Sequence, residues 1–443
     1  MSLRTSSPHA TPPANGMAGS WTPTFCDSRS SAAPAQVVTT RIMTPSPGAP
    51  ALSSPLPVTD ESRRRGACPT LDAPMQTGDG LLARIRVRGG ILTPSQLRRV
   101  AELAAIHGNG LVEVTARGNL QVRGLTAWSA PTLADAVLAD VDVETGLVVD
   151  TSPLAGCDPH ETGPSRSVAA AISEGAAGFA NRLGPKVCVV VDGAGQISLS
   201  ALKADIRLLA VGSNVWSVTL GGGKPQLLEQ DAALAATLAV LGALAAMGPQ
   251  ARAVDLFPAA GVVASRRSLT AVALGMPMNR TEGTTQAIAL PFGSVVSERL
   301  AALASAAEGA GVSAFRLGPD HTLLIDDATP AVIDAAERLG FVTTADDPRL
   351  RISACIGSSG CASGHIAARD IAARLASELP ADTTLHVSGC AKGCAHPRPA
   401  DVTLVGLVQG IGLVIDGRAG DTPRYMLDES RLGDVFVRSQ DAR

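Results

Sequence analysis

A unit of one strand, one helix and two further strands is predicted twice in this sequence, and the repeat limits what the chain can fold into. Residues 82–88 alternate between apolar and polar side chains, which is the pattern of a strand with two different faces. Thr93 then provides a helix N-cap, and Gln96 completes a capping box. The predicted elements are 82–88, 94–107, 111–115 and 120–124 in the first copy, and 287–290, 297–308, 313–317 and 321–325 in the second.

The segments that follow the two units also correspond. Each copy continues with a loop, a helix and a strand, at 152–158, 167–180 and 187–191 in the first copy and at 355–361, 366–379 and 384–387 in the second. Residues 210–283 connect the copies and include an Ala/Leu-rich stretch, 232–247, that is predicted to form a buried helix. A duplicated chain is expected to fold into two related halves with pseudo-two-fold symmetry, in the α+β class.

Only the second copy carries two closely spaced cysteine pairs. Cys355 and Cys361 have five residues between them, and Cys390 and Cys394 have three. Glycines flank both pairs, so the backbone can turn tightly and bring amide N–H groups near the sulfurs. Four thiolates on two such turns are typical of an iron–sulfur cluster. A zinc site and four unrelated buried thiols are the alternatives, although five intervening residues suit zinc poorly.

Composition argues against several classes of protein. The chain has 443 residues, 45% of them hydrophobic and 17% charged, which is enough to bury cores in more than one domain. Aromatic residues make up 2% and the net charge is −3, so nucleic-acid binding has little support. No apolar run is expected to cross a membrane, and eight cysteines in a chain of this length fit a reduced, cytoplasmic setting.

The first predicted strand places several arginines on one face. Arg84, Arg86 and Arg88 alternate with apolar residues and so share one side of the strand. Arg117 and Arg123 add to this set from the neighbouring predicted strands. Like charges that are packed together are unfavourable without an anionic partner, and guanidinium groups bind carboxylates in a bidentate manner. The arrangement favours a carboxylate-bearing ligand, with a solvated sheet face as the alternative.

The cysteine arrangement resembles the signature of the sirohaem-containing nitrite and sulfite reductases, which hold a [4Fe–4S] cluster on four such residues. The resemblance implies that Cys355, Cys361, Cys390 and Cys394 bind one [4Fe–4S] cluster. It also places Cys394 where those reductases bridge the cluster to the sirohaem iron. Four further segments are similar to the precorrin-3B synthases, a family that acts in aerobic cobalamin synthesis, and they are 67–71, 74–82, 152–158 and 386–396.

The resemblance implies a duplicated nitrite/sulfite reductase-like architecture. Two ferredoxin-like half-domains and two α/β cluster-type domains would be related by a pseudo-two-fold axis. The implied parts are half-domains at 66–130 and 284–345, a cluster-less α/β domain with its connector (131–283), a cluster-binding α/β domain (346–427) and a tail (428–443). Residues 1–60, which contain Cys26, are rich in Ser, Pro, Thr and Ala without a hydrophobic period, and this composition predicts a disordered extension.

The same resemblance implies an iron–sulfur monooxygenase that hydroxylates precorrin-3A at C20 and closes a lactone. Dioxygen, an NAD(P)H-linked reductase or ferredoxin as electron donor, and a mononuclear non-haem iron would take part. The sequence assigns no catalytic residue. The candidates for binding substrate carboxylates are Arg84, Arg86, Arg117, Arg123, Lys186 and Lys392, and those considered for the second iron are Asp158, His160, His365, His386 and His396.

The sequence departs from the reductases just before Thr151. Those enzymes commonly carry an Arg-Asn pair there, whereas this chain has Val149 and Asp150. An arginine that would bind sulfite or nitrite is therefore missing, and an ionised Asp150 would repel an anion. A sirohaem-dependent sulfite or nitrite reductase stays as the alternative function, and a non-catalytic iron–sulfur electron carrier as a further alternative.

Overall fold

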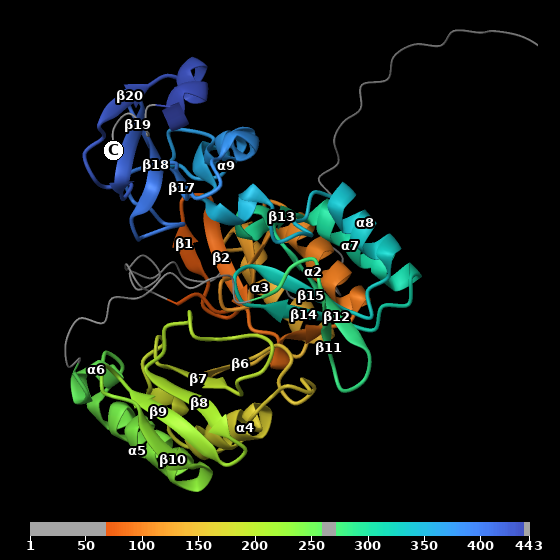
Figure 1. The fold of residues 1–443 in the computed structure, drawn as a ribbon, viewed down its shortest axis with the longest axis vertical. Coiled ribbons are helices and arrows are strands. Elements are labelled where there is room, and N and C mark those ends of the chain that lie inside the picture. The colour runs from red at the N-terminus through yellow and green to blue at the C-terminus, as the bar shows by residue number, and fades with distance from the viewer. Residues whose placement is uncertain (1–67, 259–271, 438–443) are drawn as a thin grey trace, which may run out of the picture. The chain divides into compact units, whose positions relative to one another are not determined.

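The computed structural model describes residues 68–258 and 272–437, which contain four five-stranded sheets (Figure 1). All of these residues belong to one compact unit, Ser53–Arg443. The predicted extension with Cys26 and the end of the predicted tail lie outside the described residues. The finer domain boundaries therefore stay a prediction.

Two of the sheets contain the repeated unit, and each takes its last strand from the other copy. The first sheet has the order β1 (Met75–Thr77), β2 (Gly80–Ile85), β5 (Leu120–Leu125), β4 (Leu111–Val114) and β13 (Ser294–Val296). The second has the order β11 (Pro277–Asn279), β12 (Thr284–Ala289), β15 (Thr322–Asp326), β14 (Phe315–Gly318) and β3 (Ile91–Leu92). The predicted repeat is therefore present as two sheets that exchange one short strand.

The helices of the repeat pack against each other and against strands of these sheets. They are α2 (Pro94–His107) and α7 (Ser297–Gly309), with α3 (Ser129–Asp140) beside α2 and α8 (Pro330–Arg338) beside α7. The predicted capping box is confirmed, because Thr93 Oγ1 accepts from Gln96 N while the Gln96 side chain accepts from Thr93 N. Gly90 and Gly293 stand at the same place in the two copies, with φ of +67° and +75°, where a side chain would be strained.

The other two sheets share a topology. One contains β6 (Val148–Thr151), β7 (Cys188–Asp192), β8 (Ile206–Gly212), β9 (Val215–Leu220) and β10 (Gln226–Glu229). The other contains β16 (Ile352–Ala354), β17 (Leu385–Ser388), β18 (Ala400–Leu407), β19 (Gly410–Gly417) and β20 (Tyr425–Leu427). In both sheets, the first three strands in chain order are parallel to one another. Each of the last two strands runs antiparallel to the strand before it.

Each of these sheets has a helix that follows its first strand in the chain. These helices are α4 (Ser165–Ala176) against β6 and β7, and α9 (Ala368–Leu375) against β16 and β17. The shared order of strands and helix confirms the predicted duplication of the α/β part. Shorter helical turns complete the described structure, at Arg88–Gly90, Ala180–Arg182, α6 (Ala253–Leu256), Pro291–Gly293, Pro348–Arg351, Gly357–Ser359, Ala376–Glu378 and Glu429–Asp434.

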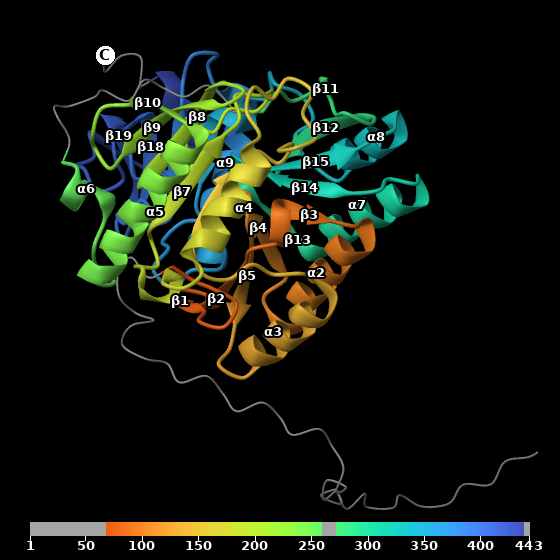
Figure 2. The same ribbon diagram turned by 90° about the horizontal axis from the view of Figure 1, so that it is seen from below.

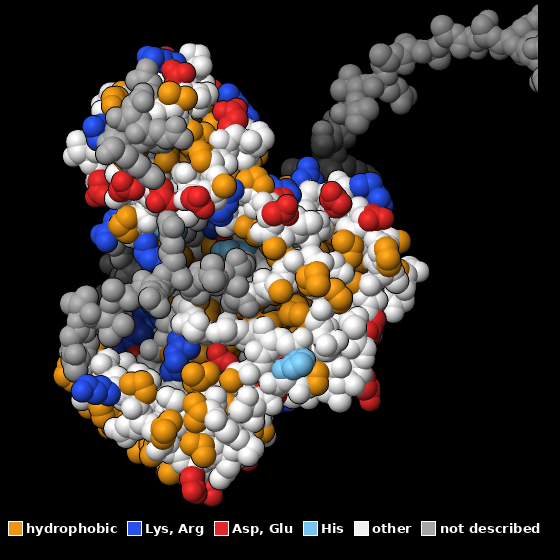
Figure 3. Space-filling view, in the orientation of Figure 1, with side chains coloured by type: hydrophobic (Ala, Val, Ile, Leu, Met, Phe, Trp, Pro, Cys, Tyr) orange, Lys and Arg blue, Asp and Glu red, His pale blue; other side chains and the backbone are white. Residues whose placement is uncertain are grey.

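The Ala/Leu-rich stretch forms α5 (Gln230–Met247), which lies beside α4 over the β6–β10 sheet (Figure 2). By length and composition alone α5 would be long and apolar enough to cross a membrane, a property that core helices of soluble proteins share. Its Thr237, Leu241 and Leu244 are buried in the core of this sheet. The prediction of a buried helix holds for that face only, because apolar side chains remain exposed over α5 and β10 (Figure 3), such as Leu227 at 70%.

Candidate functional site

The four cysteines of the two pairs follow neighbouring parallel strands. Cys355 comes directly after β16, and Cys390 comes shortly after β17. Because parallel strands end at the same edge of a sheet, both cysteine turns lie at that edge. Burial raises the pKa of the Cys394 thiol, and the charges of Cys390, Cys355 and Cys361 act in the same direction. The structure thus brings the four predicted ligands together.

The surroundings of these sulfurs fit an iron–sulfur cluster. Gly389 N donates to Cys355 Sγ at 3.0 Å, a contact that stabilises a thiolate ligand. Ala362 N donates to Gly78 O at 3.1 Å, so the hairpin of β1 and β2 lies against the first cysteine turn. A Cβ atom at Gly78 would be 2.4 Å from Cys361 Sγ, so only glycine allows this approach.

A site for a single metal ion fits the described residues less well than an iron–sulfur cluster does. In that part of the chain, no group of three or more His, Cys, Asp and Glu side chains could hold one ion. This arrangement disfavours zinc, which needs four ligands around one centre, whereas each thiolate of a cluster binds a different iron atom. It also means that the residues considered for a second iron, Asp158, His160, His365, His386 and His396, do not form such a group.

His386 is buried beside the second cysteine turn. Its side chain is fully buried, and neither ring nitrogen has a hydrogen-bond partner. The ring of His396 lies close by, with 5.6 Å between the ring centroids. Burial lowers the pKa of His386 to about 4, with a smaller contribution from His396. His386 is therefore neutral at physiological pH.

The buried state of His386 predicts a pH-dependent loss of stability. The unfolded chain takes up a proton near pH 6.5, whereas the folded protein resists protonation of His386 down to about pH 4. This difference in protonation does not affect stability well above pH 6.5. As the pH falls toward 4 it lowers the free energy of unfolding, by about 3 kcal/mol at pH 4. His386→Leu should therefore lose less stability than the wild type between pH 7.5 and 5, measured by thermal unfolding. The exposed His160→Leu is the control, and parallel curves for His386→Leu and wild type would contradict the prediction.

Arg84 is a candidate cation that is largely buried and has no ion-pair partner among the described residues. It lies on β2, and its Nε atom is buried without a hydrogen-bond partner. No described residue forms an ion pair with its guanidinium group. Burial lowers the pKa of Arg84, and the charges of Arg117 and Arg86 act in the same direction. An anionic ligand would relieve this cost, because a buried charge is unfavourable unless it is paired.

Arg117 is already engaged within the protein. It donates to the Asp150 carboxylate and to Lys203 O, and its Nη2 lies 3.5 Å from Cys188 Sγ. Burial raises the pKa of Asp150, and the opposing effect of Arg117 does not reverse this. Asp150 is thus already paired with Arg117 within the protein.

The other predicted cations are placed less favourably for a shared site. The strand β2 ends at Ile85, so Arg88 leaves the predicted arginine face and forms an exposed pair with Asp142. Arg86 donates to Gly146 O and Leu147 O and approaches Glu144 at 3.5 Å. Arg123 pairs with Asp79 and Glu113, Lys186 is exposed, and Lys392 donates to Ser363. The acids that neutralise these cations come from other elements, which the strand pattern does not predict.

Two charged residues near the cysteine turns were not identified from the sequence. Glu113 and Arg369 form an ion pair of 3.2 Å across 256 positions of the chain. No local pattern joins residues so far apart. The position of Arg369, eight residues after Cys361, was the one available signal.

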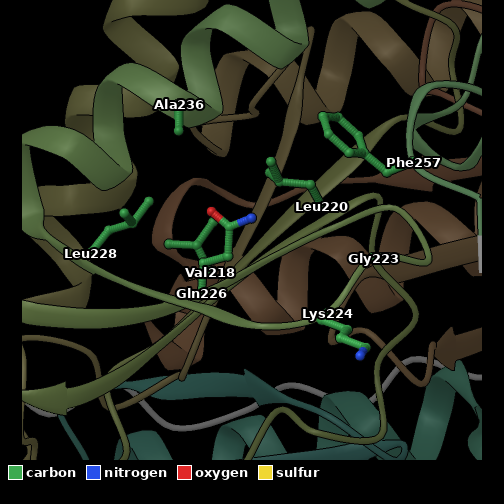
Figure 4. Close-up of a pocket in the computed structure, with 8 residues that line it drawn as sticks. All are labelled: Val218, Leu220, Gly223, Lys224, Gln226, Leu228, Ala236 and Phe257. Atoms are coloured by element: carbon green, nitrogen blue, oxygen red, sulfur yellow. The ribbon is translucent and has the colours of Figure 1, made fainter. Parts of the chain in front are cut away.

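The small pocket in Figure 4 is separate from these residues. It has a volume of about 70 Å³ and lies between β9, β10, α5 and Phe257. Ligand pockets usually enclose about 300–1,000 Å³, so it is too small for a tetrapyrrole. Its lining contains a single charged side chain, Lys224.

Comparisons with known proteins agree with the architecture. Residues 73–140 match the family described as nitrite/sulfite reductase ferredoxin-like half domain. The solved structure of NirA from Mycobacterium tuberculosis superposes with a TM-score of 0.58 at 18% identity, covering 81% of this chain and 80% of that one, which shows a shared fold. A ferredoxin–nitrite reductase of Synechococcus elongatus is 24% identical over 76% of this chain and 80% of its own length.

A precorrin-3B synthase of Sinorhizobium sp. is 37% identical over 419 residues, which cover 87% of this chain and 91% of that protein. These relatives are oxidoreductases. The similarity extends well beyond the matched half-domain. The chain therefore belongs to the precorrin-3B synthase family, within the nitrite and sulfite reductase superfamily.

Proposed function

We propose that this protein hydroxylates precorrin-3A at C20, with closure of a ring A acetate to a lactone, as a step of aerobic cobalamin synthesis. The observation that carries the proposal is the 37% identity to a precorrin-3B synthase over nearly the full length of both chains. The reaction adds one oxygen atom from dioxygen and needs two electrons from a donor, for which an NAD(P)H-linked reductase or a ferredoxin is suitable. A cytoplasmic location is part of the same proposal.

The substrate site is proposed to include Arg84. A tetrapyrrole of this kind carries several carboxylate side chains, and a buried guanidinium group without a partner favours binding one of them. Arg117 would also bind the substrate if a substrate carboxylate displaced Asp150 from the guanidinium group of Arg117. Arg86, Arg123, Lys186 and Lys392 stay as further candidates. Fixed carboxylates would hold the ring in one orientation, so that one meso carbon is presented for reaction.

The cofactor proposed for the four cysteines is a [4Fe–4S] cluster, which supplies electrons one at a time when bound. Gly389 contributes its N–H to Cys355 Sγ, and Gly78 allows the hairpin to cover Cys361. A mononuclear non-haem iron is part of the proposal because dioxygen reacts slowly with a closed-shell ring without a redox metal. We assign no residue to that iron, since the described residues offer no group of three ligands.

A sirohaem-dependent sulfite or nitrite reductase is the second candidate. The identity of 24% to a ferredoxin–nitrite reductase supports it. Asp150 disfavours it, because a carboxylate stands where an anion-binding arginine would be expected and already neutralises Arg117. An electron carrier without catalysis would leave the buried charge of Arg84 unexplained.

Labelled oxygen gas tests the proposed reaction. Purified protein with its cluster is supplied with precorrin-3A, a reductant and ¹⁸O₂, and the product is analysed by mass spectrometry. One labelled atom should appear in the product hydroxyl group. A product without label, or rapid sulfite or nitrite reduction after loading with sirohaem, would favour the second candidate. The optical spectrum adds a check, because sirohaem gives strong visible bands whereas a [4Fe–4S] cluster alone gives a broad brown shoulder.

A further inference from the structure

A buried chain of charges joins the first ferredoxin-like sheet to the first cysteine turn. Asp79 binds Arg123 through two hydrogen bonds of 2.7 and 2.9 Å. Arg123 approaches Glu113 at 3.5 Å, and Glu113 in turn binds Arg369 at 3.2 Å. None of the four side chains is more than 18% exposed. Two positive and two negative groups therefore alternate in a region that water reaches poorly.

Both ends of this chain of charges border the turn from Cys355 to Cys361. Asp79 follows Gly78, whose carbonyl accepts from Ala362 N. A Cβ atom at Gly360 would lie 3.9 Å from Asp79 Cβ. At the other end, Arg369 is in the first turn of α9. The start of this helix lies close to Gly357, since a Cβ atom at Gly357 would be 2.4 Å from Ala368 N.

Arg369 has the least complete hydrogen bonding of these four charged residues. Its Nε is buried without a hydrogen-bond partner, and Glu113, the one carboxylate paired with it among the described residues, also approaches Arg123. A cation in the first turn of a helix is also disfavoured by the helix dipole, so the stability of α9 does not explain it. Burial lowers the pKa of Arg369, whereas Glu113 and the nearby thiol of Cys355 act in the opposite direction. A further negative charge beside Arg369 would complete its environment.

We propose that Arg369, held in place by Glu113, raises the reduction potential of the cluster bound to Cys355, Cys361, Cys390 and Cys394; this inference rests on the cofactor proposed above. Reduction by one electron adds one negative charge to the cluster. A buried cation nearby stabilises that charge, because electrostatic interactions are strong where water is excluded. Glu113 limits the effect by offsetting part of the positive charge. The pair would therefore set how readily the cluster accepts an electron from its donor.

The test is a redox titration of the full-length protein with its cluster, using dithionite as reductant and electron paramagnetic resonance to follow the reduced cluster. Arg369→Met removes a positive charge and should lower the potential. Glu113→Gln removes a negative charge and should raise it. Each change is expected to alter the reduced-to-oxidised ratio at a fixed potential by about tenfold, which is about 59 mV for one electron.

The opposite signs separate this proposal from simple damage to the site. Loosening of the turn would expose the cluster in both variants and shift both potentials in the same direction. Arg369→Lys keeps the charge and should stay near the wild-type potential, and the exposed Arg374→Met on the same helix is the matched control. Shifts of equal sign in the two charge variants, or a Lys variant that shifts as far as the Met variant, would overturn the proposal. Wild-type protein without cluster iron would instead refute the proposed cofactor, and this inference with it.

Discussion

Replacing any one of Cys355, Cys361, Cys390 and Cys394 with serine should remove most of the cluster from the purified protein. A cluster of this type is held by one thiolate at each of its four iron atoms, and a serine hydroxyl is a much poorer ligand for iron. The brown absorbance should be bleached, and the iron content of each variant should fall severalfold below that of the wild type. Iron and acid-labile sulfide analysis, together with the optical spectrum, measure the result.

Cys157→Ser is the matched control for these four variants. Cys157 lies in the corresponding loop of the cluster-less copy. Its carbonyl oxygen accepts a hydrogen bond from Thr281 N at 2.7 Å, and in the other copy Ala362 N, next to Cys361, donates to Gly78 O. This variant should keep a full cluster, and so should Cys26→Ser. Full iron content in all four Ser variants of the cysteine turns would show that the assignment of the ligands is wrong.

Arg84→Ala should weaken the binding of precorrin-3A by at least about tenfold while the cluster stays intact. Loss of a charge-assisted pair from a partly buried site costs roughly 2–5 kcal/mol, and tenfold corresponds to about 1.4 kcal/mol. Anaerobic titration measures the affinity, and iron analysis confirms the cluster. The exposed Arg88→Ala should bind as the wild type does, since Arg88 pairs with Asp142 at the surface. Unchanged affinity of Arg84→Ala would refute its role.

The role of Arg117 needs a different variant. Arg117→Ala should also weaken binding by at least about tenfold, but it leaves Asp150 buried without its partner, which by itself destabilises the fold. Asp150→Asn removes the competing carboxylate and keeps the side-chain shape. If Arg117 binds a substrate carboxylate, Asp150→Asn should tighten binding. Equal or weaker binding by that variant would assign Arg117 to a structural ion pair.

The sequence by itself determined the features that depend on neighbouring residues. The capping box at Thr93, the glycine at equivalent turns of the two copies, and the spacing of the cysteine pairs are local patterns, and local backbone preferences enforce them. Because the pattern recurs, the duplication could also be predicted. How the two cysteine turns meet was not among these predictions, because it depends on the parallel pairing of β16 with β17 that the structure shows.

Only the tertiary structure decided which charges are neutralised. The arginines of β2 and its neighbours looked alike in the sequence, yet Asp150 engages Arg117 while Arg84 has no described counter-ion. The exchange of β3 and β13 between sheets and the pairing of Glu113 with Arg369 likewise join residues that are far apart in the chain. The physical reason is that an ion pair or a strand pairing depends on distance in space, which no short sequence pattern encodes.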